Sequence, residues 1–302
     1  MRIQLDPHMT PFSLSHTLSC GQTFRWQQKD DYWVGVVGKR VLKLRQVSND
    51  GIEFRASSPS VDVNFVRRYL RLDDDLPAIY SRIERDRYVR AAVKRFCGLR
   101  LVRQEPWECL VSYICATFKN IPAIKQMILN LSRRFGSPLT FEGERFYSFP
   151  EASVLAEARL HELRLCKLGY RAEYVRENAR IVAKDMLNLE RLKDLPYMSA
   201  KRALVSLPGV GSKVAGCVLL FSLDKLEAFP IDVWMKRIML KYYSQHLEPE
   251  FVERLKKRSS LSKSDYEVLD AFGRRYFGEY VGYAQEYLYH FERCKASSVA
   301  DN

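Results

Sequence analysis

The chain has 302 residues, 47% hydrophobic and 28% charged, as expected for a globular protein with a sizeable core. It has no run of about 18 apolar residues, and its first residues lack the apolar segment of a signal peptide. We therefore expect no membrane-spanning helix and place the protein inside a cell. The net charge of +13 and the pI of about 9.4 favour a polyanionic partner, above all a nucleic acid, over a membrane surface.

One basic segment and the arrangement of the cysteines restrict the possible classes of site further. The basic cluster RLKKRSSLSK (254–263) is interpreted as a solvated helix end and loop. The cysteines are odd in number, scattered and never spaced as Cys-x-x-Cys, which argues against a disulfide framework, a structural zinc site and a cysteine-ligated iron–sulfur cluster. They are Cys20, Cys97, Cys109, Cys115, Cys166, Cys217 and Cys294.

The first sixty residues are predicted to form strands. Residues 32–47 (YWVGVVGKRVLKLRQV) alternate in polarity and are rich in valine, which is typical of a half-buried strand or hairpin. Asn49-Asp50-Gly51 is a strong hairpin turn signal, and residues 52–56 resume the strand. The pattern predicts an antiparallel sheet that ends at Ser57 to Ser60.

From about Val61 the apolar residues recur at helical spacing. Residues 107–118 are apolar nearly all round and predict a buried helix, and residues 121–136 predict an amphipathic helix that ends at Gly136. Further helices are expected at 171–187, at 199–207 with Ser199 as N-cap, and around 283–291. The fold class is α+β, with an N-terminal antiparallel sheet domain and flanking helices (1–96) before a mainly helical body (97–302) that contains a helix–hairpin–helix (199–222).

Two of these helices are joined by Pro208-Gly209-Val210-Gly211. The main-chain amides after such a turn point outward at a helix N-terminus and bind a phosphate without any side chain. This geometry holds a DNA strand by its backbone and reads no sequence. A plain helix connector is the alternative, because a Gly-x-Gly pair alone is weak evidence.

Lys213 lies in the first turn of the second helix, where the helix dipole disfavours a cation. Desolvation adds to this effect, so a neutral amine becomes accessible that attacks electrophilic carbon such as C1′ of a deoxyribose. Asp232 follows after one helix and one loop; it is a natural N-cap, and it can also stabilise an oxocarbenium-like charge. The alternatives are an exposed surface lysine and a purely structural cap.

The stretch LPGVGSKVAG…PIDVW resembles the helix–hairpin–helix–Gly/Pro-Asp superfamily of DNA glycosylases. Four further segments resemble the 8-oxoguanine DNA glycosylase/AP lyase family of that superfamily, in the same order along nearly the whole chain. They are SCGQTFRW (19–26), VRQEPWECLVSYICATFKNI (102–121), LGYRAEYV (168–175) and GYAQEYLYH (282–290). The family has an N-terminal sheet domain, in agreement with the predicted fold.

The resemblance implies a chemistry and a partner. The damaged nucleotide is flipped out of double-stranded DNA that contains 8-oxoguanine, Lys213 attacks C1′ and forms a Schiff base, and β-elimination nicks the strand on its 3′ side. Asp232 supports the positive charge and the proton transfers. No cofactor or metal is needed, and we expect a monomer that does not bind membranes.

The resemblance also assigns the base pocket. The Gly21 carbonyl would accept the N7 hydrogen that distinguishes 8-oxoguanine from guanine. Gln285 would read the Watson–Crick edge, and Tyr289 and Cys217 would sandwich the base; many family members have phenylalanine at the Tyr289 position. Without the resemblance, Gly21 would be interpreted as a turn at a strand end and Gln285 as a surface amide. Tyr289 and Cys217 would be interpreted as core side chains.

The remaining implied contacts hold DNA. Eukaryotic members have three consecutive asparagines after the buried helix, and an arginine three positions further on, which contact the opposite cytosine. Here these positions hold Phe118, Lys119, Asn120 and Ala123, so we expect weak discrimination of the opposite base. Phe118 is equally well a core residue that closes the helix. The other expected DNA-binding residues are Gly209, Val210, Gly211, Val214, Tyr170, Arg171 and Trp234. A glycosylase for another damaged purine and a non-catalytic DNA-binding module remain alternatives.

Overall fold

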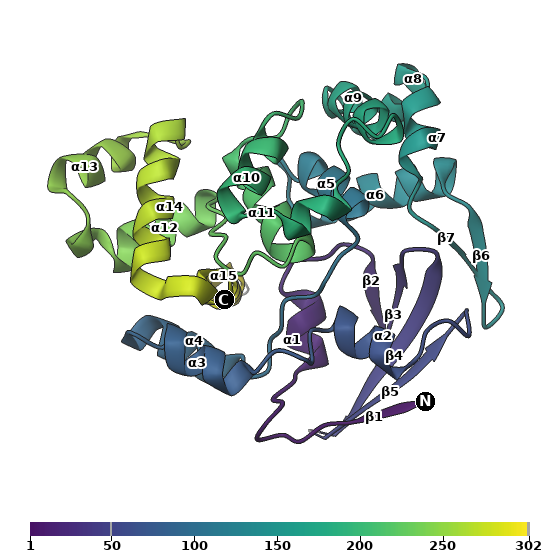
Figure 1. Ribbon diagram of the computed structural model, residues 1–302. Helices are drawn as coiled ribbons and strands as arrows, with labels where there is room; N and C mark the ends of the chain where they lie inside the picture. The colour runs from purple at the N-terminus through teal and green to yellow at the C-terminus, as the bar shows by residue number, and fades with distance from the viewer. Residues whose placement is uncertain (49, 301–302) are drawn as a thin grey trace.

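The computed structural model describes residues 1–48 and 50–300 and contains an antiparallel sheet beside a helical body (Figure 1). The strand order is β1-β5-β4-β3-β2, and every neighbouring pair is antiparallel. The strands are β1 (Arg2–Gln4), β2 (Trp26–Lys29), β3 (Tyr32–Val37), β4 (Arg40–Ser48) and β5 (Gly51–Ala56). The predicted sheet is confirmed, and Ser48 pairs with Gly51 at the expected turn, although Asn49 itself lies outside the described residues.

One part of the strand prediction is wrong, because a short helix, α1 (Leu14–Ser19), interrupts the first sixty residues. Ser13 caps this helix by accepting a hydrogen bond from His16 N at 3.3 Å. The helix buries Leu14 and Leu18 against the sheet. A helix of six residues contains too few turns to produce a readable 3.6-residue pattern.

The sheet's core is built from alternate residues of β4 and β5. Leu42, Leu44 and Phe54 are fully buried, with Leu44 opposite Phe54 in the register. Trp26 lies across this core and donates a hydrogen bond from its indole nitrogen to the Tyr69 hydroxyl at 2.7 Å. The sheet is therefore tied to the helix that follows it, α2 (Val63–Tyr69).

The helical body follows the predicted order. The buried helix α5 and the amphipathic helix α6 agree with the prediction, and α6 ends at Gly136, where a Cβ would lie 2.0 Å from the Ser148 carbonyl oxygen. Ser199 is not an N-cap, because α10 already begins at Tyr197 after Pro196. The helices are α3 (Leu76–Ile83), α4 (Arg87–Arg95), α5 (Pro106–Cys115), α6 (Ile121–Phe135), α7 (Ala152–Glu157), α8 (Leu160–Leu165), α9 (Arg171–Ala183), α10 (Tyr197–Val205), α11 (Ser212–Ser222), α12 (Val233–Tyr242), α13 (Pro249–Lys257), α14 (Lys263–Phe277) and α15 (Val281–Ala300), with short 3-10 turns η1 (Glu190–Asp194), η2 (Ser244–His246) and η3 (Gly278–Tyr280).

A second hairpin, β6 (Pro138–Phe141) and β7 (Glu144–Tyr147), was not predicted from the sequence. Leu139, Phe141 and Phe146 pack on a small cluster formed by valines of β3 and β4. The hairpin thus extends from the helical body to the outer face of the sheet (Figure 1). Its strands of four residues are too short to show a clear alternation.

The division of the chain at residues 96 and 97 stays a prediction. The buried side chains of α3 and α4, including Leu76, Ile79 and Val93, belong to the same hydrophobic cluster as the helical body. Helix α15, which Figure 1 shows nearly end-on at the centre of the molecule, packs against α3, α4, α12 and α14. The packing therefore associates α3 and α4 with the C-terminal helix rather than with the sheet.

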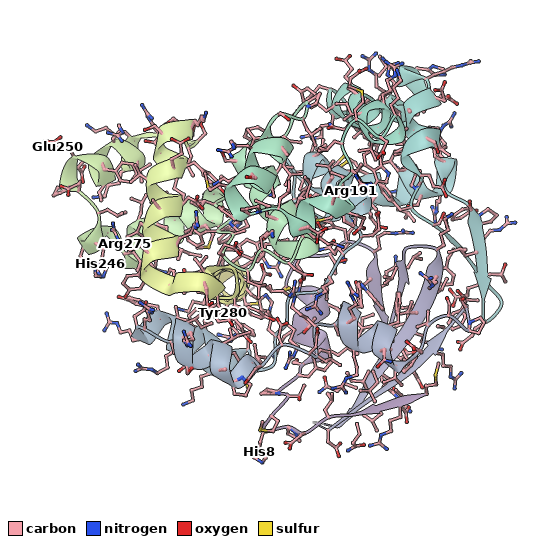
Figure 2. All side chains as sticks on the ribbon, viewed as in Figure 1. His8, Arg191, His246, Glu250, Arg275 and Tyr280 are labelled. Atoms are coloured by element: carbon pink, nitrogen blue, oxygen red, sulfur yellow. The ribbon has the colours of Figure 1, made fainter. Side chains whose placement is uncertain are left out.

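The start of α14 is held by the carboxylate of Asp265. Ser262 and Asp265 exchange main-chain to side-chain hydrogen bonds of 3.1 Å in a capping box. Arg254 and Arg258, from the basic segment 254–263, pair with the same carboxylate at 3.3 and 2.7 Å. The predicted helix end and loop are present, but Arg254 and Arg258 pair with Asp265, and Lys256 pairs with Glu253. This end of the molecule carries His246, Glu250 and Arg275 in Figure 2.

We expect Asp265→Asn to lower the free energy of unfolding at neutral pH by about 1–3 kcal/mol, because a buried carboxylate would lose charged hydrogen bonds. Burial raises the pKa of Asp265, but hydrogen bonds from Ser262 and Arg258 outweigh it and lower this pKa to about 2. The stabilisation is complete above the unfolded-state value of about 4 and is lost as the pH falls through the folded-state pKa. Urea unfolding at about pH 7 and pH 3 measures this, and an equal deficit at both values contradicts the assignment.

Candidate active site

Lys213 is the second residue of α11, and its side chain is half-buried. Its Nζ lies 4.9 Å from the centroid of the Tyr113 ring, above a face that attracts cations. The Cys217 thiol lies beside it, one turn further along the helix. Burial raises the pKa of Cys217 to about 11, although the nearby Lys213 charge opposes this change. The amine is therefore held between a phenol ring and a neutral thiol at the edge of the core.

Asp232 caps α12, as predicted: its Oδ1 accepts a hydrogen bond from Met235 N at 2.9 Å. The loop before it lies directly against α11, because a Cβ on Gly216 would be 3.3 Å from Pro230 Cα and 3.1 Å from the Tyr266 hydroxyl. The Tyr266 hydroxyl donates a hydrogen bond to the Phe229 carbonyl at 3.1 Å and accepts one from the main-chain amide of Ile231 at 3.3 Å. The charges of Asp232 and Lys213 both act on the Cys217 thiol, so these three groups share one small region.

The backbone conformation and the packing require glycine at one of the two hairpin positions, Gly209, but not at the other, Gly211. Gly209 has φ +73°, and a Cβ there would lie 2.5 Å from the Tyr174 ring, so its own structure requires glycine. Gly211, the N-cap of α11, has φ −87° and no protein atom within 4 Å of its Cβ position. Neither its φ nor its packing requires glycine, which suits an N-cap position, and the space around it is open to another molecule. Val210 and Val214 are buried, so only their main-chain groups are placed for such a contact.

Gly21 lies in the segment after α1 with φ +105°. A Cβ on it would meet Arg293 Nη1 at 2.5 Å and Ile121 Cδ1 at 3.0 Å. The next residue, Gln22, ties this segment to the helical body: its amide donates to the Arg100 carbonyl at 2.8 Å, and its own carbonyl accepts from the Tyr113 hydroxyl at 2.9 Å. Tyr113 therefore contacts both the Gly21 segment and Lys213, a role that the sequence did not reveal.

The residues of α15 that are predicted to line the base pocket are more buried than surface side chains would be. Gln285 is 5% exposed, and its Oε1 has no hydrogen-bond partner in the described part of the chain. The surface-amide alternative is therefore wrong. Tyr289 lies one turn further on, half-buried, with the Arg293 guanidinium 5.5 Å from its ring centroid. Cys217 is 3% exposed.

Glu286 was not predicted from the sequence, although an acidic residue within an otherwise apolar stretch of helix was a usable signal. It is 2% exposed and lies close to the Cys20 thiol. Burial raises the pKa of Glu286 to about 7, although the Cys20 thiol and the Arg293 charge oppose this change. Its Oε1 has no hydrogen-bond partner among the described residues.

The loop between α5 and α6 carries a strained aromatic residue. Phe118 is 84% exposed at φ +53°, so the interpretation as a core residue is wrong. Tyr170 is 54% exposed, whereas Arg171 is 4% exposed and donates hydrogen bonds to the carbonyls of Thr117 and Leu168. Arg171 thus supports the Phe118 loop from beneath, and its direct contact with DNA stays a prediction.

Three further residues that are expected to contact DNA are exposed or partly exposed. Lys119 is exposed, and Asn120 caps α6 by accepting a hydrogen bond from Ala123 N at 3.0 Å. Trp234 is partly exposed in the first turn of α12, with the Arg237 guanidinium 5.5 Å from its ring. Within residues 1–48 and 50–300, no group of three potential ligands is arranged for a metal ion, and no helix is long and apolar enough to cross a bilayer.

Comparison with known proteins identifies the family. The model of the 8-oxoguanine DNA glycosylase N-terminal domain matches residues 4–110, from the first strand into α5. A probable N-glycosylase/DNA lyase of Methanothermobacter thermautotrophicus is 34% identical over 72% of this chain and 71% of its own. The N-glycosylase/DNA lyase of Saccharomyces cerevisiae is 31% identical over 91% of this chain and 82% of its own. The chain belongs to the 8-oxoguanine DNA glycosylase family.

A solved structure extends the likeness to the whole fold of this family member. The 8-oxoguanine glycosylase/lyase of Clostridium acetobutylicum, in complex with double-stranded DNA containing cytosine opposite 8-oxoG, is 30% identical with a TM-score of 0.84. The alignment covers 94% of this chain and 93% of that one, so it includes the sheet, the hairpin helices and α15.

We expect Phe118→Asn to leave the free energy of unfolding unchanged or to raise it by up to about 1 kcal/mol. Asparagine tolerates positive φ better than phenylalanine, and the exposed ring contributes little packing. Binding of duplex DNA should weaken. Phe149→Asn is the matched control, because Phe149 is buried and its loss should cost about 3 kcal/mol or more. Urea unfolding and fluorescence anisotropy measure both effects; a comparable loss in the two variants would show that Phe118 is structural.

Proposed function

We propose that this protein is a bifunctional DNA glycosylase/lyase that removes 8-oxoguanine from double-stranded DNA, with Lys213 as the nucleophile. The observation that carries the proposal is the position of Lys213: a half-buried amine at the N-terminus of a hairpin helix, in one region with Asp232. A DNA-binding module needs only the hairpin backbone and has no use for this pair. The family of the chain and its likeness to a glycosylase/lyase bound to 8-oxoG DNA support the same conclusion.

The reaction follows from the groups around Lys213. The amine of Lys213 attacks C1′ of a flipped nucleotide, the C1′–N9 bond breaks, and the base leaves with a proton. The sugar ring opens to a Schiff base, and loss of the C2′ proton expels the 3′ phosphate and nicks the strand. Asp232 stabilises the positive charge that develops on the sugar. Tyr113 and Cys217 hold the amine in place before the attack.

Base selection is assigned to the pocket between Gly21 and α15. The Gly21 carbonyl accepts the N7 hydrogen of 8-oxoguanine and repels the N7 lone pair of guanine. The unpartnered Oε1 of Gln285 is a free acceptor for a donor on the Watson–Crick edge. Tyr289 and Cys217 supply the two faces. A glycosylase for another damaged purine is less favoured, because an alkylated base lacks the N7 hydrogen.

Double-stranded DNA is held without sequence readout in this proposal. The first-turn amides of α11 take a phosphate at Gly211, where the structure leaves room for another backbone. In this proposal Phe118 and Tyr170 fill the space left by the flipped base, and Lys119 and Trp234 contact the DNA backbone. The net charge of +13 adds long-range attraction. We infer an intracellular protein that works on DNA as a monomer.

Lys213→Gln should abolish excision and covalent trapping by borohydride on an 8-oxoguanine duplex, while binding of that duplex stays within about threefold, because glutamine cannot form a Schiff base. Lys256→Gln is the matched control, since Lys256 is exposed and pairs with Glu253 on its own helix. Denaturing gels read both reactions. Base release at an appreciable rate by the Lys213 variant would overturn the nucleophile assignment.

The wild-type protein should excise 8-oxoguanine opposite C, T, G and A with little discrimination. A bidentate base contact contributes about 1–3 kcal/mol of discrimination, and Phe118 and Ala123 offer none to cytosine. Single-turnover rates opposite each base test this. A preference for cytosine of about a hundredfold, near 2.7 kcal/mol, would show that other residues read the opposite base. Ala123→Arg, which restores the family's guanidinium, should increase the preference for cytosine.

A further inference from the structure

The buried carboxyl of Glu286 has no role in the reaction as proposed so far, and this inference rests on the proposed function. Glu286 follows Gln285 on α15, and each side chain carries a buried oxygen without a hydrogen-bond partner in the part of the chain that the structure describes. An unsatisfied buried acceptor costs about 1–3 kcal/mol. Such unsatisfied acceptors on consecutive residues, with Glu286 close enough to act on the Cys217 thiol, indicate groups that receive a ligand rather than groups that stabilise the fold.

The contacts of Glu286 place it on the same wall of the pocket as Gly21. The Cys20 thiol, which precedes Gly21 in the chain, lies close enough to the carboxyl for each group to affect the pKa of the other. The Cys20 thiol is in turn fixed by Thr17 O at 3.3 Å and by the Gln22 amide at 3.2 Å. The Gly21 carbonyl and the Glu286 carboxyl are thus connected through one buried and rigid segment.

The hydrogen-bonding groups of 8-oxoguanine are complementary to the Gly21 carbonyl and a protonated Glu286 carboxyl. Its N7 hydrogen lies between two carbonyl oxygens, at C6 and C8, so this edge reads acceptor, donor, acceptor. The Gly21 carbonyl meets the central donor, and each flanking carbonyl requires a hydrogen-bond donor. A protonated carboxyl supplies that donor, whereas a carboxylate would repel the carbonyl.

We propose that Glu286 is a specificity-determining residue whose protonated carboxyl donates a hydrogen bond to a carbonyl oxygen of the flipped 8-oxoguanine, beside the Gly21 contact. Burial favours the protonated form, and the pKa of about 7 places the loss of that proton near neutral pH. Recognition of the lesion over an abasic site therefore weakens as the pH rises through this value.

Other charged and titratable groups face Glu286 from the elements around it. They are Cys20 after α1, Tyr113 on α5, Lys213 and Cys217 on α11, Asp232 at the start of α12, and Tyr289, His290 and Arg293 on α15. Burial raises the pKa of both thiols and both phenols. It lowers the pKa of His290 to about 3. These five groups do not change protonation between about pH 6 and pH 8.

The test measures binding with no chemistry, in the Lys213→Gln background. Fluorescence anisotropy gives the Kd for a duplex with 8-oxoguanine and for the same duplex with a tetrahydrofuran abasic analogue, from about pH 6 to pH 8.5. The ratio of the two Kd values isolates the contact with the base and removes the contribution of the DNA backbone. Glu286→Gln, Glu286→Leu and the control Glu292→Gln, on the same helix, are compared with the parent.

The parent and the Glu292→Gln control should lose about tenfold of their preference for the lesion over this pH range. Glu286→Gln keeps a donor that does not titrate, so its preference should stay high at every pH. Glu286→Leu should show a low preference at every pH. A parent preference that is constant or rises with pH, or a Glu286→Leu preference equal to the parent's at pH 6, overturns the inference. Failure of the wild-type protein to excise or trap at 8-oxoguanine would instead overturn the proposed function.

Discussion

The close contact between α11 and the loop that carries Asp232 is the constraint on which the rest of the site depends. It exists because Gly216 has no side chain: a Cβ there would press on Pro230 and on the Tyr266 hydroxyl. Tyr266 bonds the loop main chain on both sides of Pro230 and so fixes where α12 begins. With both helix N-termini fixed, the amine of Lys213 and the carboxylate of Asp232 are positioned before any ligand arrives, which lowers the cost of organising them during a reaction.

Several residues assigned to the site have arrangements that do not stabilise the fold. Gln285 and Glu286 are buried on α15, each with an acceptor oxygen that has no hydrogen-bond partner among the residues that the structure describes, and Phe118 holds an exposed ring at positive φ. Each arrangement reduces stability, and each is supported by rigid neighbours: Cys20 for Glu286, and Arg171 for the Phe118 loop. Unsatisfied and strained residues of this kind are typical of binding sites.

Much of the fold was accessible from local patterns. The alternation in residues 32–47 predicted the sheet, and the continuous apolar stretch at 107–118 predicted the buried helix α5. The errors concern short elements: α1 and the β6–β7 hairpin are too short for a period to emerge. Ser199 was a plausible cap by residue type, but α10 already begins at Tyr197, with Pro196 as its N-cap. The N-cap role of Asp232 could be predicted because capping is a local interaction.

The sequence by itself determined the identities of the chemical groups: a lysine behind a glycine turn, an aspartate at a helix start, and a glutamine and a tyrosine four residues apart on one helix. Only the tertiary structure decided which of them meet. The burial of Gln285 and Glu286, the exposure of Phe118 and the burial of Arg171 arise from contacts between elements far apart in the chain, such as Arg171 with Thr117 and Gly21 with Arg293. A side chain's desolvation depends on every neighbour that surrounds it, and those neighbours come from helices and loops whose relative positions no local pattern encodes.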